Sequence, residues 1–547
     1  MKKSSILIIV LFLIIYILPL GVRPIVIPDE SRYAEIPREM IDSGDWIVPR
    51  LNGLRYFEKP VLGYWINAAS MILFGENAFA LRLPSAIEAG ISALMLFFLL
   101  RRFVGRDSTG VFAASIFLTF FEVFGVGTYN VLDSLLSMFI TATMVLYFFA
   151  QMEIRPGKKN RLLALSGISC GLAFLTKGFI AFAIPLVVIV PFMIWERRWK
   201  ELFRVCWIPL ITAVLVSLPW AVMIHIREPD FWHFFFWNEH IKRFMADSAQ
   251  HKRSIWYFFL LLPGAALPWS FLLPAAGSGL KQDGFESPII RFAICWFLFP
   301  FLFFSVSNGK LLTYILPCFP PLAILAAIGL HNYFERGKTK AFTIGSLLLA
   351  GVIAILAFAL IVVQIAGFQG FKPYALYWKG ALATAGLLSW TLFAIFSIKT
   401  SKHRKKIVLY AAAPALLMFV APFIMPDQTI RVKSPGGFFL RHANKIGPDT
   451  VLVSDENTLR AACWFYKRRD VYLLGPAGEL TYGLHFEDSK HRQLDPEQFK
   501  EYILKSRGTH PVILIATAWN YKNWKQDLPQ PLFEDSSGEG GFVFAQF

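Results

Sequence analysis

Residues 341–366 read AFTIGSLLLAGVIAILAFALIVVQIA and contain no Asp, Glu, Lys or Arg. A helix of about 20 apolar residues spans the hydrocarbon core of a bilayer, which is roughly 30 Å thick. The whole chain shares this bias, because 56% of its residues are hydrophobic and only 17% are charged. An ordinary soluble chain has a charged share of about 25%. The composition therefore predicts an integral membrane protein.

Windows of low charge recur along the chain and predict about thirteen transmembrane helices, so the expected fold class is an α-helical polytopic membrane protein. The windows lie near residues 5–23, 80–101, 110–126, 131–151, 160–176, 178–196, 203–225, 256–276, 288–306, 311–332, 341–366, 376–398 and 405–424. Lys2 and Lys3 precede the first window, as in a secretory signal. No small-residue cleavage site follows it, so we expect this helix to be retained.

Prolines interrupt two of these windows. Pro263 and Pro268 lie in one, and Pro317, Pro320 and Pro321 lie in another. Proline removes a helical hydrogen bond, so both helices are predicted to be kinked.

The formal net charge of +17 comes largely from short basic loops on every second connection between the windows. This pattern matches the positive-inside bias of membrane proteins, and it does not favour a nucleic-acid partner. The basic loops and the N-terminus are therefore predicted to be cytoplasmic. Loop 24–79, loop 226–254 and the tail from about residue 425 are then expected on the opposite side.

Composition divides the chain into two predicted domains. Residues 1–424 form a transmembrane domain, in which the aromatic and charged loop 24–79 is expected to form amphipathic juxtamembrane helices at the membrane surface. Residues 425–547 are less apolar and predict a small soluble α/β domain. Its expected strands are 450–454, 471–474, 512–515 and 541–544, and its expected helices are 456–467 and 496–507.

Two polar clusters lie in loop 24–79. In the first, PDESRYAE at 28–35, Asp29 is a candidate cap of a helix beginning near Ser31, and Arg32 and Tyr33 follow within about one turn. The simplest interpretation of this cluster is a solvated helix start with a local ion pair. In the second, YFEKPVLGYW at 56–65, Glu58 and Lys59 lie among large apolar residues. An anionic lipid headgroup would partner such a lysine, although interfacial snorkelling also explains it.

Further ionisable residues are predicted at the same membrane face. Asp133 lies just inside a window, where a charge is costly and is usually paired or functional. The full set is Asp29, Arg32, Glu58, Lys59, Asp133, Lys177, His240, Arg243, Lys310 and Tyr314. Such a group suits a reaction between lipid-linked anions, because cations neutralise a leaving phosphate and carboxylates orient or deprotonate an acceptor.

The motifs DESRYAEI at 29–36, SGDWIVP at 43–49, LRYFEKP at 54–60 and REPDFWH at 227–233 resemble those of the aminoarabinose lipid A transferases. These are multi-spanning GT-C-type glycosyltransferases, related to protein O-mannosyltransferases and oligosaccharyltransferases. The resemblance implies transfer of 4-amino-4-deoxy-L-arabinose from undecaprenyl phosphate to lipid A phosphates, at the periplasmic face of a bacterial inner membrane. Such a transfer lowers the negative charge of lipid A and gives resistance to polymyxin and other cationic antimicrobial peptides. The implied partners are the lipid-linked donor, lipid A and membrane lipids, with the protein acting as a monomer.

The resemblance also implies roles for single residues. Asp29 matches the leading acidic catalytic position and Asp133 the second. The substrate-binding positions are Arg32, Tyr33, Glu58, Lys59, Lys177, Arg243, Lys310 and Tyr314, of which Lys59, Arg243 and Tyr314 are expected to hold the carrier phosphate. Glu58 and His240 match a position open to a divalent metal, although no obligatory metal is expected. Ser31 and Leu312 depart from the family pattern, which usually has Thr and Pro there.

The role expected of Asp29 depends on whether the acceptor is a phosphate or a hydroxyl group. A phosphate has a second pKa of about 6 and is already anionic near neutral pH, so Asp29 would orient more than deprotonate. A transferase of another sugar, of mannose or hexosamine type, to a lipid or protein hydroxyl would instead need Asp29 as a base. A lipid flippase is a further alternative, but it predicts related halves and polar groups near the middle of the bilayer, and neither is found. In the remaining alternative, the C-terminal domain binds a partner and the membrane part is its anchor.

Overall fold

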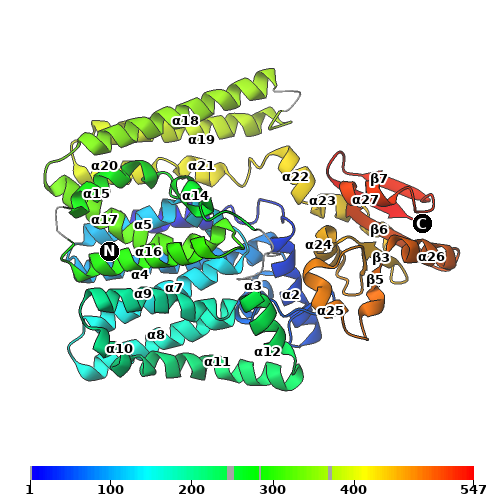
Figure 1. Cartoon of the computed structure of the whole chain (residues 1–547). Coiled ribbons are helices and arrows are strands. Elements are labelled where there is room, and N and C mark those ends of the chain that lie inside the picture. Colours follow the sequence, from blue (N-terminus) through cyan, green and yellow to red (C-terminus); the bar gives the residue numbers. More distant parts are fainter. Residues whose placement is uncertain (1–2, 243–251, 282–284, 368–371) are drawn as a thin grey trace. The chain divides into compact units, whose positions relative to one another are not determined.

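The structure is a computed structural model that describes residues 3–242, 252–281, 285–367 and 372–547. The chain forms two compact units (Figure 1). The first, here called the helical unit, comprises Met1–Leu20, Arg82–His225 and Trp232–Ile424. The second, here called the mixed unit, comprises Gly21–Leu81, Ile226–Phe231 and Met425–Phe547.

Long apolar helices run side by side in the helical unit (Figure 1). Among the described residues, 7 helices are long and apolar enough to cross a membrane, or up to 9 if two bent pairs each count as one span. The seven are α4 (Ala78–Phe103), α7 (Leu132–Gln151), α11 (Trp207–Arg227), α16 (Pro288–Val306), the continuous η4 (Leu312–Cys318) and α17 (Phe319–Glu335), α18 (Lys340–Ala366) and α19 (Tyr377–Lys399). The chain is therefore a membrane-spanning protein.

The other predicted windows also contain helices, but these are shorter or less apolar. They are α1 (Lys3–Phe12) with η1 (Leu13–Ile17), α8 (Pro156–Lys177), α9 (Ile180–Trp195), and α20 (His403–Ala412) with α21 (Ala415–Val420). The shorter helices α10 (Trp199–Val205), α12 (Phe231–His233) and η2 (Phe234–Lys242) lie between them along the chain. Length and composition thus support seven to nine of the thirteen predicted spans.

The two bent pairs meet at their breaks. α5 (Asp107–Thr119) and α6 (Phe121–Gly127) are bent by 67°, and α14 (Tyr257–Ala265) is bent by 93° from the segment formed by η3 (Trp269–Leu272) and α15 (Leu273–Lys281). The backbone N–H of Phe121 donates to the carbonyl of Leu267 at 2.9 Å, and the Trp269 indole donates to the Thr119 hydroxyl at 2.9 Å. The two bent pairs therefore bond to each other where their helices are interrupted, and polar groups at the interruptions find partners there. The kink predicted from Pro263 and Pro268 is confirmed.

The second set of prolines has a milder effect. The segment Leu312–Glu335 passes from the 3-10 helix η4 to the α-helix α17 between Pro317 and Pro320. The two helices count as one candidate span, so these prolines change the helix type within it.

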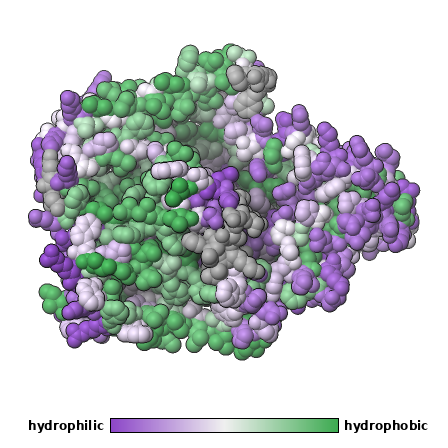
Figure 2. Space-filling view, in the orientation of Figure 1, coloured by the Kyte–Doolittle hydropathy of each residue, from purple (hydrophilic) through white to green (hydrophobic). Residues whose placement is uncertain are grey.

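Hydrophobic residues cover much of the surface of the helical unit (Figure 2). Large apolar side chains with more than half of their area exposed include Phe203, Leu260, Val306, Ile355 and Phe358. A water-soluble surface rarely exposes so many apolar side chains together, whereas lipid tails solvate them.

A six-stranded sheet forms the core of the C-terminal part of the mixed unit, in the order β5-β4-β3-β6-β8-β7. The strands are β3 (Val451–Ser454), β4 (Tyr472–Leu474), β5 (Gln493–Leu494), β6 (Val512–Thr517), β7 (Phe533–Ser536) and β8 (Phe542–Gln546). The first four are parallel, while β8 runs antiparallel to β6 and β7 antiparallel to β8. The four predicted strands are confirmed as β3, β4, β6 and β8.

Helices and turns surround this sheet. They are α22 (Asp427–Lys433), α23 (Gly436–Arg441), η5 (Ala443–Lys445), α24 (Glu456–Tyr466), η6 (Gly478–Leu480), α25 (Thr481–Leu484), η7 (Lys490–Arg492), α26 (Pro496–Ser506) and α27 (Ala518–Trp524). α24 and α26 confirm the two predicted helices. Asp455 is the N-cap residue of α24, and its carboxylate accepts a hydrogen bond from the backbone N–H of Thr458. The domain boundary at residue 425 stays a prediction.

Residues 24–79 belong to the same unit as this sheet. They form α2 (Asp29–Ser43), a hairpin of β1 (Arg50–Leu51) and β2 (Leu54–Arg55), and α3 (Leu62–Phe74). Residues 30–40 of α2 are buried on every face of the helix, whereas Ile72, Leu73 and Phe74 of α3 remain exposed. The place of these helices at the membrane surface stays a prediction.

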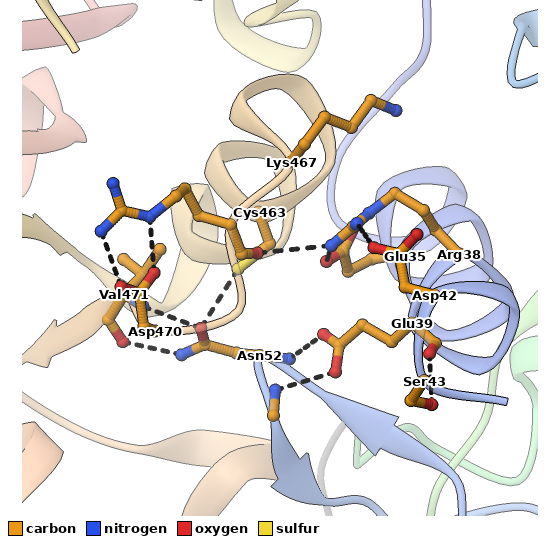
Figure 3. A network of polar contacts seen from close by, with 12 residues as sticks. Glu35, Arg38, Glu39, Asp42, Ser43, Asn52, Cys463, Lys467, Asp470 and Val471 are labelled. Atoms are coloured by element: carbon orange, nitrogen blue, oxygen red, sulfur yellow. Dashed lines mark hydrogen bonds and ion pairs between the residues drawn. The ribbon is translucent and has the colours of Figure 1, made fainter. Parts of the chain in front are cut away.

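A buried polar network explains how so polar a helix as α2 is buried (Figure 3). The Glu39 carboxylate accepts the backbone N–H groups of Asn52 at 2.5 Å and Gly53 at 2.8 Å. Both turn residues have positive φ, which the Asn-Gly pair of a tight hairpin tolerates. The Asn52 side chain in turn bonds the N–H and C=O of Val471 at 3.0 and 2.7 Å. The network thus joins α2 and the hairpin to the residue that precedes β4.

Candidate functional site

The first turn of α2 carries two of the predicted site residues. α2 begins at Asp29, with Pro28 in the cap position, so the predicted capping role of Asp29 is wrong. Its carboxylate instead pairs with a guanidinium nitrogen of Arg32, one turn later. The helix geometry brings residues i and i+3 together, which is why this pair forms locally.

Arg32 is shared between two carboxylates. Its Nη2 pairs with Asp29, and its Nη1 pairs with Glu479, which lies in η6. Nη1 also lies 3.4 Å from the Tyr56 hydroxyl. The side chain of Arg32 is 10% exposed, whereas that of Asp29 is 39% exposed. Asp29 is therefore the member of this group that remains open to a ligand.

Glu479 is the centre of the cluster, and the sequence analysis did not select it. Its Oε2 accepts hydrogen bonds from the Tyr56 hydroxyl at 3.1 Å and from Arg460 at 2.9 Å, besides the pair with Arg32. Burial alone would raise the pKa of Glu479, but the charges of Arg32, Arg460 and Lys59 outweigh it and hold the pKa well below its ordinary value. The carboxylate is therefore ionised at neutral pH.

A local signal could have identified Glu479. It follows the turn Gly475-Pro-Ala-Gly478, which comes directly after β4. In open α/β sheets, ligands bind outside the carboxyl ends of the parallel strands, so a carboxylate at this edge is a site candidate.

The other predicted residues of loop 24–79 lie around the same cluster. The Arg32 guanidinium lies 4.9 Å from the centroid of the Tyr33 ring, which stacks on Tyr64 at 6.2 Å. The Lys59 ammonium donates to the backbone carbonyl of Glu58 at 2.7 Å and lies 3.9 Å from its carboxylate. The mixed unit therefore gathers Asp29, Arg32, Tyr33, Glu58 and Lys59, joined by Tyr56, Arg460 and Glu479.

A second group lies in the helical unit. Asp133 is in the first turn of α7, and Lys177 is the last residue of α8. Their side chains form an ion pair at 2.7 Å and are 13% and 15% exposed. The Lys177 ammonium also lies 4.8 Å from the centroid of the Tyr314 ring. The expectation that Asp133 would be paired is confirmed.

Lys310 is bound by backbone carbonyl groups. Its ammonium donates to the backbone carbonyls of Arg253, at 3.0 Å, and Ser307. These bonds hold two loops together. The predicted substrate-binding role of Lys310 stays a prediction.

Two predicted residues fall where side chains are not described. Arg243 lies outside the described residues, and so does the side chain of His240, near the end of η2. Among the side chains that are described, no three His, Cys, Asp or Glu residues are placed to hold a metal ion together. A pair formed by Glu58 and His240 therefore stays a prediction.

Known proteins match the chain over nearly its whole length. Residues 3–235 match the sequence model of the family described as dolichyl-phosphate-mannose-protein mannosyltransferase, and residues 430–544 match that of the arabinosyl transferase ArnT C-terminal domain. The undecaprenyl phosphate-alpha-4-amino-4-deoxy-L-arabinose arabinosyl transferase of Shewanella sediminis is 42% identical over 95% of this chain and 94% of its own length. The protein of the same name from Aeromonas hydrophila subsp. hydrophila is 39% identical over 92% of each chain.

The fold agrees with a solved structure. The crystal structure of ArnT from Cupriavidus metallidurans bound to undecaprenyl phosphate superposes with a TM-score of 0.83, at 23% identity, and covers 99% of this chain and 97% of that one. The structure of the same protein in the apo state gives a TM-score of 0.84. From the sequence matches, the chain is a glycosyltransferase and belongs to the family of the undecaprenyl phosphate-4-amino-4-deoxy-L-arabinose arabinosyl transferases.

Proposed function

We propose that this protein transfers 4-amino-4-deoxy-L-arabinose from undecaprenyl phosphate to a phosphate group of lipid A. The observation that carries the proposal is the cluster of Asp29, Arg32, Lys59 and Glu479, in which a half-exposed carboxylate lies among cations. The names of the relatives support the donor and the sugar. The cations of this cluster suit an acceptor that carries a phosphate, as lipid A does.

The proposed reaction exchanges one phosphate for another at the anomeric carbon. An oxygen of the lipid A phosphate forms a bond to that carbon, and the bond to the carrier oxygen breaks. Undecaprenyl phosphate leaves with the electron pair. The acceptor oxygen is already ionised, so no proton has to be removed, and the dominant requirement is charge stabilisation.

The chain's own residues meet this requirement in distinct ways. Lys59 and Arg243 stabilise the phosphate that leaves, with Tyr314 as a further ligand of the carrier phosphate. Asp29 holds either the ammonium group of the donor sugar or the acceptor in line with the anomeric carbon. Asp133, oriented by Lys177, is the second carboxylate of the site. Tyr33, Glu58 and Lys310 complete the binding positions, and Glu58 with His240 offers a place for a divalent ion.

The proposed topology has thirteen transmembrane helices, with the N-terminus and the basic loops in the cytoplasm. Loop 24–79 and the domain 425–547 then face the periplasm of a bacterial inner membrane. The distribution of Lys and Arg among the short loops supports this orientation. The enzyme is proposed to act as a monomer, and its product gives resistance to polymyxin and cationic antimicrobial peptides.

Steady-state kinetics of the purified, reconstituted enzyme test the role of Asp29. Asp29→Asn is expected to lower kcat at least about 100-fold, because misplacing a reactant by about 1 Å has an effect of that size. Asp42→Asn is a matched control, because Asp42 lies on the same helix and pairs with Arg38 at 2.5 Å. Turnover of Asp29→Asn equal to that of Asp42→Asn would remove Asp29 from the mechanism.

A protein hydroxyl is the second candidate acceptor, because residues 3–235 match the dolichyl-phosphate-mannose-protein mannosyltransferase family. A hydroxyl must lose a proton in the reaction, so Asp29 would then act as a base. Incubation of the enzyme and labelled donor with either lipid A or a serine-containing peptide distinguishes the two. Label in the peptide and none in lipid A would favour this alternative.

A further inference from the structure

We propose that Glu479 is a positioning residue of the transferase site. Through Arg32 it fixes the place of Asp29, so that the C-terminal sheet supplies part of the site. This inference rests on the proposed function, because it assigns Glu479 a task in the transfer reaction.

The sharing of one guanidinium by two carboxylates is the first observation. Arg32 is nearly buried, and a buried guanidinium has to be paired. Were Asp29 its only anionic partner, the two side chains would neutralise each other fully and Asp29 would be drawn toward Arg32. Glu479 takes a separate nitrogen of Arg32 and leaves Asp29 39% exposed. Asp29 can then meet a substrate without leaving Arg32 unpaired.

The contacts of Glu479 show that it is itself held rigidly. Tyr56 and Arg460 both donate to the same oxygen that pairs with Arg32. Arg460 is almost fully buried, and Glu479 is its nearest carboxylate, since Glu456 lies farther away at 3.7 Å. Loss of the Glu479 charge would leave two guanidinium groups close together without the anion between them, and Arg32 would move.

The sheet determines where Glu479 can lie. β4 ends at Leu474, and the turn that follows has positive φ at Gly475 and Gly478. At Gly478 a Cβ atom would lie 1.7 Å from a carboxylate oxygen of Glu456, so no other residue fits without displacing that side chain. α24 begins at the carboxyl end of the neighbouring strand β3, carries Arg460 and packs against α2. Open α/β sheets bind ligands at the carboxyl ends of their parallel strands. In this sheet, Glu479 follows the carboxyl end of β4 and binds Arg32 of the same chain.

The network of Figure 3 fixes the same helix at a second place. Glu39 on α2 binds the hairpin turn at Asn52 and Gly53, and Asn52 binds Val471 just before β4. α2 is therefore held to the β4 region at two places, through Arg32 near its first turn and through Glu39 farther along the helix. Two separate attachments restrict both the position and the rotation of the helix that carries Asp29.

Kinetics of the reconstituted full-length enzyme with lipid A and the lipid-linked sugar donor test the proposal. Glu479→Gln is expected to lower kcat by about 10-fold to 100-fold, with a much smaller change in the KM for the donor. Glu534→Gln is the matched control, because Glu534 lies in β7 of the same sheet and pairs with Lys525 and Tyr521. The control is expected to keep wild-type turnover.

A double variant separates positioning from a merely structural role. If Glu479 acts through Asp29, then Asp29→Asn with Glu479→Gln is no slower than Asp29→Asn alone. Should Glu479→Gln fail to fold, Tyr56→Phe keeps the test, because it removes the hydrogen bonds of the Tyr56 hydroxyl with Glu479 and Arg32 and leaves every charge in place. Tyr56→Phe is expected to lower kcat by about 3-fold to 10-fold, with the same non-additivity toward Asp29→Asn.

Two results would overturn the inference: Glu479→Gln turning over as fast as Glu534→Gln, or losses that multiply in the double variant. If Glu479→Gln does not fold but Tyr56→Phe does, wild-type turnover of Tyr56→Phe would also overturn the inference. A wild-type enzyme that transfers no sugar to lipid A would instead refute the proposed function, and it is recognised before any variant is compared.

Discussion

At the scale of single residues, the site depends on how charges are shared. Arg32 separates Asp29 from Glu479, and Lys177 pairs with Asp133. In both groups a cation holds a carboxylate that the proposed reaction uses. A buried charge without a partner is costly, so in each group the cation compensates the carboxylate beside it.

The pairing of Glu479 predicts a pH dependence of stability. A carboxyl group whose pKa is lowered on folding stabilises the protein fully above its unfolded pKa, and the contribution is lost as the pH falls through the folded pKa. The pKa of Glu479 is held below its ordinary value of 4.5. The difference in melting temperature between wild type and Glu479→Gln should thus be constant from about pH 5 to 8 and shrink at lower pH. Thermal unfolding in detergent at several pH values measures it, and a difference that grows on acidification would contradict the assignment.

The ion pair of Asp133 and Lys177 predicts that substitutions of the two residues have non-additive effects on stability. Asp133→Asn or Lys177→Met alone leaves one partner uncompensated, and each is expected to destabilise the protein by about 3 kcal/mol. The double variant should lose clearly less than the sum of the two. If Asp133 also serves the reaction, the double variant recovers stability but not turnover. Additive losses of stability, measured by thermal unfolding, would mean that the pair contributes little.

At the scale of elements, close contacts between helices depend on small residues. A Cβ atom at Gly279 in α15 would lie 1.9 Å from the carbonyl oxygen of Gly329 in α17. Membrane helices associate through such close backbone contacts. A Cβ at Gly277, on the same helix, would meet nothing within 4 Å.

These two glycines predict opposite effects of the same substitution. Gly279→Ala is expected to lower the free energy of unfolding by about 1–3 kcal/mol, because the two helices must move apart. Gly277→Ala is expected to be neutral or to stabilise by up to about 1 kcal/mol, since Ala favours a helix over Gly. Thermal unfolding of both variants checks this. Equal melting temperatures would show that α15 and α17 do not pack as closely as described.

Helices and strands could be predicted from the sequence where a local pattern of residue types is enough to specify them. The apolar windows gave the long helices, and runs of β-branched and aromatic residues gave β3, β4, β6 and β8. β5 and β7 were missed, because β5 has two residues and β7 alternates between exposed and half-buried residues. The hairpin at residues 50–55 did carry a signal, Asn52-Gly53, which was not singled out.

The environment of α2 could not be predicted locally. Its sequence is polar and indicates a solvated helix, yet the structure buries it, because its charges are compensated by residues far along the chain. Glu479 lies 447 positions after Arg32, and no periodicity relates two such residues. The motif pointed to Asp29 and Arg32, whereas their partner became visible only in the folded chain.

At the scale of the whole molecule, the proposed reaction moves a sugar between two membrane lipids with anionic headgroups. Apolar helices place the chain in the bilayer, and carboxylates among cations provide the means to move a sugar between phosphates. The central claim is that this chain attaches aminoarabinose to lipid A.

Mass spectrometry of lipid A from bacteria that make the lipid-linked donor, with and without this protein, tests that claim most directly. Lipid A carrying 4-amino-4-deoxy-L-arabinose on phosphate is expected in cells with the wild-type chain. The same modification should be lost in cells with Asp29→Asn and retained with Asp42→Asn. Identical, unmodified lipid A in cells with and without the wild-type protein, although donor and protein are both present in the membrane, would contradict it.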